Sequence, residues 1–298
     1  MIELSGLLAL DTLALPALAK LDHLLAQERA AKSHQEGGLQ EISAYSAGLV
    51  QDAERSGLPV TVRDNIAIVS LRGIMLKSYP YASSYVASSA HVRAAIKAAR
   101  LDESIDHIVI MSDTPGGDVR GMHELGDEIT AAAQSKNVVV QIEGTLASAG
   151  YHVAVGASAI YASHRMNSVG SIGVRTSLWD TAEMYENAGI KVIKVDTGEH
   201  KSTGQEGVPI TEPQVAEVQR VVDQLYAEFL AVIIAGRGIT EKELKPLADG
   251  RSWFAYEAEG FGLIDAIQPL ETTLASLAAR QQKGGMTRAA ADELFKDF

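Results

Sequence analysis

Two kinds of hydrophobic pattern alternate along the chain. Continuous apolar runs rich in β-branched residues, such as 65–73, predict buried strands. Segments with apolar residues at every third or fourth position predict helices; in 88–102 these residues are Val92, Ile96 and Ala99. A second helix is predicted at 121–135. Further strands are predicted at 106–112, 137–144, 158–163, 170–177 and 188–196.

The longest helix is predicted at 211–238. Thr211 and Gln214 have the spacing of a capping box, and Pro213 lies in the first turn. One apolar stripe follows along this helix, made of Val215, Val218, Val222, Leu225, Phe229 and Val232. An amphipathic helix of this length needs a surface on which to bury its stripe.

Repeated strand–helix units with fully apolar strands predict an α/β fold with a mainly parallel sheet. We expect a helical N-terminal extension over 1–60 and a main domain over 61–270. A C-terminal helix with a short flexible tail is expected over 271–298. The Leu- and Ala-rich start is interrupted by Asp11, Pro16 and Asp22, so it predicts neither a secretory signal nor a membrane anchor.

The amino-acid composition excludes several classes of function. Of 298 residues, 46% are hydrophobic and 21% charged, which is typical of a folded globular chain. The formal net charge of -12 argues against nucleic-acid binding. Cysteine is absent, which excludes disulfides, thiolate catalysis and cysteine-ligated zinc. No metal and no cofactor is expected.

Three loops that follow predicted strands contain unusual chemistry. The first, 112–121 (SDTPGGDVRG), contains Gly116 and Gly117. Paired glycines between a strand and a helix can turn backbone N–H groups toward an anionic oxygen. The same residues could equally form an ordinary tight turn, and the dipeptide alone does not decide between the two.

The second loop, 145–158 (TLASAGYHVAVGAS), contains Ser148 at a strand-to-helix junction. A serine there can be a helix N-cap. It can also be a nucleophile, because unpaired N–H groups at the helix start could bind an oxyanion. The small side chain of Ala149 leaves room for a substrate backbone.

A nucleophilic serine needs a base. His152 is four residues from Ser148, but an i+4 side chain on a helix points along its surface instead of toward the serine. The third loop offers Lys201, which is flanked by small residues and glycines (GEHKSTG). A lysine can act as a base where its surroundings disfavour the charged form. Lys194, inside a predicted strand, is the weaker candidate, and solvation alone would also explain a loop lysine.

The order TPGGDV, ASAGYHVA, NSVGSIGV, GEHKSTG, DGRSWFAYEAEGFGLIDAI resembles the signal peptide peptidase A family of serine–lysine proteases, over about 65–270. The resemblance implies a fold related to the ClpP/crotonase superfamily. It also implies Ser148 as the nucleophile and Lys201 as the general base, 53 positions apart (201 − 148). Gly116 and Gly117 would contribute to the oxyanion hole.

The chain departs from the family pattern at two positions. Ala149 stands where the family usually has glycine, and Val169 stands where it commonly has threonine. A hydroxyl partner for the lysine would then come from Ser168 or Ser171, or be missing.

The resemblance favours the branch of tailed phages and prophages, in which soluble members cleave scaffold or capsid proteins during head maturation. It implies a ring-shaped homo-oligomer with active sites shared between subunits, in the host cytoplasm or inside the procapsid. One alternative is a cytoplasmic peptidase that degrades signal-peptide remnants. Two others come from different classes: a crotonase-like acyl-CoA enzyme, and a structural homologue that has lost activity.

Overall fold

The computed structural model describes residues 49–55, 57–80 and 85–279. The described residues fall into two compact units. Residues 174–228 form one, here called the lysine unit because it contains Lys201. The remaining described residues form the other, the sheet unit. Most of the expected N-terminal extension and the C-terminal tail lie outside the described residues, and the expected domain boundaries stay predictions.

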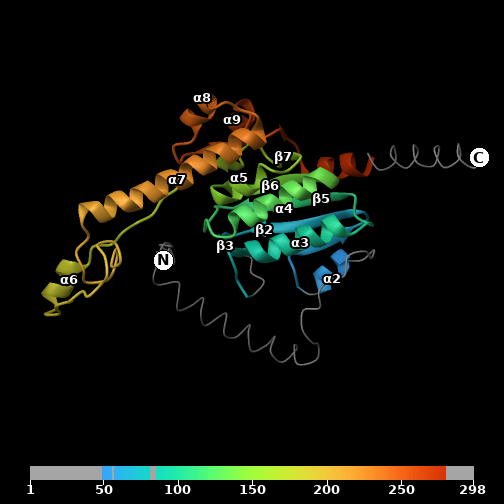
Figure 1. The fold of residues 1–298 in the computed structure, drawn as a ribbon. Coiled ribbons are helices and arrows are strands. Elements are labelled where there is room, and N and C mark those ends of the chain that lie inside the picture. The colour runs from blue at the N-terminus through green and yellow to red at the C-terminus, as the bar shows by residue number, and fades with distance from the viewer. Residues whose placement is uncertain (1–48, 56, 81–84, 280–298) are drawn as a thin grey trace, which may run out of the picture. The chain divides into compact units, whose positions relative to one another are not determined.

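The sheet unit is built on an eight-stranded, mainly parallel sheet (Figure 1). Its main path is β1-β2-β5-β6-β7-β10, and β8 pairs with β6 and with β9. Only β1–β2 and β8–β9 are antiparallel among these pairs. The strands are β1 (Val60–Arg63), β2 (Ile66–Arg72), β5 (His107–Thr114), β6 (Asn137–Ala147), β7 (Ala159–Ala162), β8 (Ser168–Gly170), β9 (Ser252–Phe254) and β10 (Ala266–Ile267). The predicted α/β class is confirmed.

A second, small parallel sheet joins β3 (Ile74–Leu76) to β4 (Val86–Ser88). The other elements of the sheet unit are helical. They are α2 (Leu49–Arg55), α3 (Ser89–Leu101), α4 (Met122–Ser135), α5 (Ala149–Ala154), α8 (Glu241–Leu244), η2 (Lys245–Leu247), α9 (Ala255–Gly260) and a helix at 270–279.

Both faces of the central sheet are covered, which explains the continuous apolar runs of its strands. Helices α3 and α4 lie side by side along one face (Figure 1). The helix at 270–279 supplies Leu277, which packs with Val109, Met111 and Val139 of β5 and β6. Beside this cluster, Thr273 Oγ1 donates a hydrogen bond to the buried Gln141 side chain (2.7 Å), which fixes the helix to the sheet.

The lysine unit contains α6 (Ala182–Asn187) and residues 212–228 of α7 (Glu212–Arg237). Its buried residues are Ser202, Val208 and Gln214. Large apolar side chains are instead exposed in this unit: Trp179, Met184, Ile190, Ile193, Val195 and Val215. The apolar stripe of α7 is therefore buried only where the helix belongs to the sheet unit, at Phe229 and its neighbours.

Two strand predictions need correction. Of the predicted strand 170–177, only Gly170 is in a strand, at the end of β8, and the predicted strand 188–196 contains no strand residue. The sequence has strand character there, but a strand also needs a neighbour with free backbone groups. The lysine unit, all of which is described, contains no strand that could pair with 188–196.

No helix in the described part of the chain is both long enough and apolar enough to cross a bilayer.

Candidate active site

Strand β6 brings Ser148 to the edge of the sheet. The first part of β6 pairs with β7, and its last residues, from Thr145 to Ala147, pair with β8. The strand ends at Ala147 and α5 begins at Ala149, so Ser148 is the single residue that turns the chain from strand to helix. The expected strand-to-helix junction is confirmed.

The backbone of Ser148 is held in a conformation that favours glycine. Its φ is 51° and its ψ is -124°, and only three described non-glycine residues have positive φ. The Ser148 N–H donates to the Gly170 carbonyl oxygen (2.8 Å), and its own carbonyl accepts from the His152 N–H (3.0 Å). The hydroxyl makes no capping hydrogen bond. Ser148 thus occupies the N-cap position of α5, but the expectation that its hydroxyl caps the helix is wrong. A conformation of this kind costs of order 1–3 kcal/mol.

Gly116 packs directly against this turn. Its φ is 92°, and a Cβ placed on it would lie 2.6 Å from the Ser148 Cβ. The Gly116 N–H donates to Thr114 Oγ1 (3.1 Å), and the Thr114 hydroxyl donates to the Gly73 carbonyl oxygen (2.6 Å). The glycine loop and the serine turn are thus in contact, and Thr114 fixes the loop.

Gly117 has a backbone N–H that the described structure leaves unpaired. Its neighbours make a bridge to Met75: the Met75 N–H donates to the Gly116 carbonyl, and the Asp118 N–H donates to the Met75 carbonyl (both 2.8 Å). In such a parallel bridge the N–H of Gly117 itself points away from the bridged strand. The N–H of Ala149, the first residue of α5, has no partner among the described residues either.

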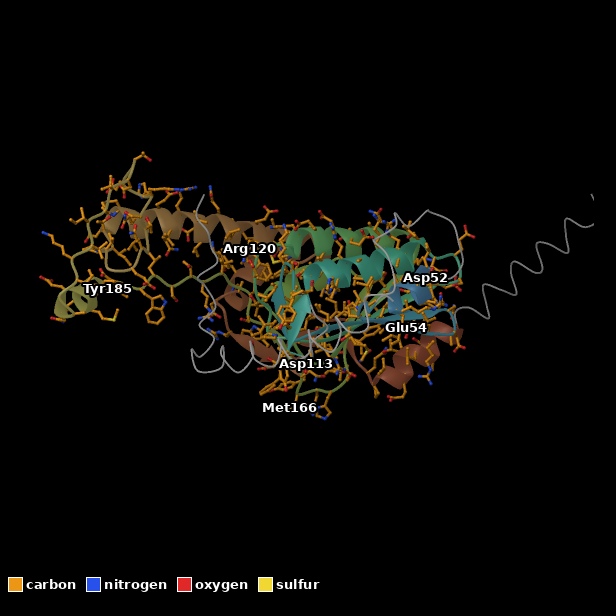
Figure 2. The ribbon with its side chains drawn as sticks, turned by 90° about the horizontal axis from the view of Figure 1, so that it is seen from below. Asp52, Glu54, Asp113, Arg120, Met166 and Tyr185 are labelled. Carbon is orange, nitrogen blue, oxygen red and sulfur yellow. The ribbon has the colours of Figure 1, made fainter. Side chains whose placement is uncertain are left out.

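The charged residues that flank the glycine loop have hydrogen-bond partners within the sheet unit. Arg120 donates from Nε to the Asp118 carboxylate (2.7 Å), and Asp113 accepts from the Thr145 N–H (3.0 Å). Figure 2 labels Arg120 and Asp113. Asp113 also fills the space beside Gly144, where a Cβ would lie 2.3 Å from its carboxylate oxygen. These groups shape the loop, and none of them accepts a hydrogen bond from the Gly117 N–H.

His152 is buried on the inner side of α5. Its ring contacts His123 of α4 edge-on, with centroids 5.1 Å apart, and Phe229 of α7 at 5.2 Å. Neither ring nitrogen has a hydrogen-bond partner among the described residues. Burial, with a smaller contribution from His123, lowers the pKa of His152 to about 4. His152 is therefore not hydrogen-bonded to Ser148 as a base would be.

Tyr151, the neighbour of His152, has a structural role. Its hydroxyl donates to the Leu263 carbonyl oxygen (2.7 Å), and burial raises the pKa of this phenol. Among the residues that the structure describes, no group of three or more His, Cys, Asp or Glu side chains could hold a metal ion.

Ser168 and Ser171 lie on either side of the residue that binds the Ser148 N–H. Ser168 begins β8, opposite Thr145 of β6. Ser171 follows Gly170, has a φ of 47°, and donates from its N–H to the Arg251 carbonyl oxygen (2.8 Å). Two of the three described non-glycine residues with positive φ, Ser148 and Ser171, thus belong to this corner of the sheet unit.

Lys201 lies in the lysine unit. It closes a turn in which its N–H donates to the Gly198 carbonyl (3.1 Å), and its side chain is exposed. No described carboxylate forms an ion pair with it. Lys194, the weaker candidate, is paired with Asp196 at 3.7 Å.

Sequence reasoning missed one supporting residue, Thr114, and one supporting hydrogen bond of Gln214. Thr114 precedes the glycine pair, and the loop sequence gives no sign that its hydroxyl fixes the Gly116 N–H. Gln214 is identified in the sequence as half of a capping box, and its Oε1 does accept from the Thr211 N–H (3.1 Å). The additional bond from Gln214 Nε2 to the Glu199 carbonyl (2.7 Å) depends on how the loop folds back.

The chain is similar to several proteases. It is 29% identical over 176 residues to a protein of Methanocaldococcus jannaschii that is named as a protease, covering 59% of this chain and 56% of that one. It is 30% identical over 182 residues to the chloroplastic serine protease SPPA of Arabidopsis thaliana, covering 60% and 27%. Capsid assembly protease C of Escherichia phage lambda is 23% identical over 246 residues, covering 80% and 56%.

The chain therefore spans between about a quarter and just over half of the length of these relatives. Among solved structures, an enoyl-CoA hydratase/isomerase family member aligns with a TM-score of 0.42 and 13% identity, over 75% of this chain and 74% of that one. The profile of peptidase family S49 matches residues 130–283, just over half of the chain and including Ser148 and Lys201. A serine-type peptidase was the class expected from the motifs, and the match confirms it at the level of the family: the chain belongs to peptidase family S49.

Proposed function

We propose that this chain is a serine endopeptidase in which Ser148 is the nucleophile and Lys201 the general base. The observation that carries the proposal is the backbone of Ser148, which keeps a serine in a conformation suited to glycine while its hydroxyl makes no capping bond. A strained backbone conformation whose side chain makes no stabilising hydrogen bond is typical of functional positions. A similar strained strand-to-helix turn presents the nucleophile in hydrolases of another fold.

The proposed reaction uses backbone groups on both sides of Ser148. The Ser148 oxygen attacks the scissile carbonyl carbon, and its proton passes to the Lys201 amine. The N–H groups of Gly117 and Ala149 bind the resulting oxyanion. The lysine ammonium then protonates the leaving amine, and the acyl-enzyme is hydrolysed by water with Lys201 again accepting the proton. We assign the oxyanion role to Gly117 because the Gly116 N–H is already bonded to Thr114.

Each site is proposed to be shared between copies of the chain in a ring, with Ser148 from one copy and Lys201 from its neighbour. The lysine unit supports this proposal because it buries few of its apolar side chains. Ile193 is 77% exposed and Val195 is 94% exposed. An exposed apolar surface of this kind usually marks an interface, and 188–196 has the strand character to pair with another chain.

Ser168 and Ser171 are proposed as hydroxyl partners for the lysine of the neighbouring copy. Both lie beside Gly170, which accepts the Ser148 N–H. In such an assembly an incoming amine that reaches Ser148 would also pass close to these residues.

The proposed substrate is a scaffold or capsid protein cleaved during phage head assembly, in the host cytoplasm or inside the procapsid. The similarity to capsid assembly protease C of phage lambda, over 80% of this chain, supports this choice. A peptidase of signal-peptide remnants is the second candidate, supported by the similarity to chloroplastic SPPA. Incubation with procapsids and, separately, with purified signal peptides distinguishes the two by which substrate is cleaved.

Covalent labelling tests the proposed chemistry. A fluorophosphonate should modify the wild-type chain at Ser148, as located by mass spectrometry, and should abolish cleavage of an unfolded protein such as casein. An acyl-CoA enzyme of the crotonase type would instead turn over a CoA thioester without labelling. A well-folded chain that shows neither labelling nor cleavage would be an inactive homologue and would contradict the proposal.

A further inference from the structure

The loop that contains Lys201 is tied to the start of α7 by one buried side chain. Gln214 is 1% exposed, although it belongs to a unit with few buried residues. Its Oε1 accepts from the Thr211 N–H (3.1 Å), and its Nε2 donates to the Glu199 carbonyl oxygen (2.7 Å). Since one partner is a donor and the other an acceptor, only one orientation of the amide satisfies both.

The identity of the side chain is informative. Gln214 is the third residue of α7, where glutamate would complete the same capping box and would also interact favourably with the helix dipole. A carboxylate could accept from Thr211 but could not donate to the Glu199 carbonyl. A neutral amide is therefore required only by the bond to the loop.

That bond reaches the turn of the proposed base. Glu199 lies between Gly198 and Lys201, and the Lys201 N–H closes the turn by donating to the Gly198 carbonyl (3.1 Å). A second tether lies on the other side of the loop, where the hydroxyl of Tyr185, which Figure 2 labels, donates to the Glu206 carboxylate (2.8 Å). Lys201 is exposed and has no described ion pair, so the position of its amine depends on the backbone of this turn.

We propose that Gln214 is a positioning residue for the general base: its buried amide couples the first turn of α7 to the 198–201 turn and so holds Lys201 where it can serve Ser148 of a neighbouring copy. The inference rests on the proposed function for the role of Lys201, but the bond itself does not.

Three variants separate helix capping from loop anchoring. Gln214→Glu keeps the acceptor for Thr211 and loses the donor for Glu199, whereas Gln214→Met keeps the volume and loses both. Gln219→Met is the matched control, since Gln219 is exposed on the same helix and donates only to Asp223. Lys201→Met serves as the reference for complete loss of the base.

Two readouts are measured on the full-length chain: amide hydrogen exchange over 198–203, and kcat and KM on casein-derived peptides. We expect both Gln214 variants to exchange faster over 198–203. We expect kcat to fall about fivefold to tenfold with KM changed by less than about twofold, since one of the hydrogen bonds that hold the loop is lost. In Gln214→Glu, exchange in the first turns of α7 should stay at the wild-type rate, and Gln219→Met should match wild type throughout.

Unchanged exchange over 198–203 in Gln214→Glu would overturn the anchoring. Faster exchange with unchanged kcat, in a chain that Lys201→Met inactivates, would overturn the positioning role and leave the proposed function standing. An active Lys201→Met chain would instead refute the proposed base, and the role of Gln214 with it.

Discussion

The two units of this chain differ in how many of their apolar side chains they bury. In the sheet unit, strands β2, β5 and β6 are buried under helices on both faces. Ser148 is held there by Gly116, His152 and Gly170. In the lysine unit the buried residues are only Ser202, Val208 and Gln214. The β-branched side chains of Ile190, Ile193 and Val195 are exposed there.

The contrast shows which half of the proposed site is complete in one chain. The serine turn has its strain, its contacts and two free backbone donors within the sheet unit. The lysine unit buries too little apolar surface to account for its own sequence, so we expect a second copy to complete it.

The largest expected effect is at Ser148. Ser148→Gly should lower peptide cleavage by at least about 10³-fold, because the nucleophile is lost. The same change should raise the free energy of unfolding by about 1 kcal/mol, because glycine adopts the observed φ of 51° without strain. Urea unfolding and a cleavage assay measure the two effects. A stability loss together with retained cleavage would remove Ser148 from the mechanism.

The next effect concerns the oxyanion donor. In Gly117→Ala the added Cβ would lie 2.1 Å from the Met75 carbonyl oxygen, so the loop must shift. We expect kcat to fall by about 10²–10³, the usual cost of one oxyanion donor. Gly126→Ala on α4 is the control, since its nearest neighbour would be at 3.8 Å. A folded Gly117→Ala chain with wild-type kcat would show that the glycine loop is an ordinary turn without an oxyanion role.

Charge on the exposed segment of the lysine unit should break the assembly. Ile193→Asp and Val195→Asp replace side chains that are exposed in a single chain, so each monomer should remain folded. We expect the oligomer to dissociate and activity to fall about tenfold or more at micromolar concentration. Analytical ultracentrifugation measures the association. Met166→Gln, which changes an exposed apolar residue of the sheet unit labelled in Figure 2, should leave both unchanged.

Wild-type behaviour of both Asp variants, in mass and in rate, would show that this segment is not an interface.

The last effect leaves the proposed active site intact and concerns only the pH dependence of the stability of the sheet unit. The pKa of His152 is lowered from 6.5 to about 4, so the unfolded chain binds this proton first as the pH falls. Stability should therefore decrease between about pH 6.5 and pH 4, by up to about 3 kcal/mol. In His152→Phe, which keeps an aromatic ring beside Phe229, this part of the decrease should disappear.

Urea titrations at several pH values measure this difference. An identical pH profile in His152→Phe would show that His152 is not held neutral by its burial.

The sequence pattern predicts the strands of the sheet unit better than it predicts the structure of the lysine unit. Where strands are buried on both faces, local pattern and tertiary environment agree, and 65–73, 106–112 and 137–144 are predicted within a few residues. Segment 188–196 has the same pattern but no partner strand in its unit, and pattern alone cannot supply one. The motifs placed Ser148 beside a glycine turn, and the contact of Gly116 with Ser148 is found.

The side-chain hydrogen bonds that hold the loops could not be predicted from the sequence. Thr114 and the second bond of Gln214 join residues whose proximity depends on how loops fold back, and nothing in their neighbours signals it. The short strands β3 and β4 were also not predicted, because three-residue strands carry too little periodicity.

The central claim is that two copies of the chain complete one site, and subunit mixing tests it most directly. Ser148→Ala and Lys201→Met chains, each inactive alone, are co-assembled in equal amounts and assayed for cleavage. Random assembly pairs an intact serine with an intact lysine in about a quarter of the sites, so we predict recovery of about a quarter of wild-type activity. No recovery, in assemblies shown by mass spectrometry to contain both chains, would contradict the shared site.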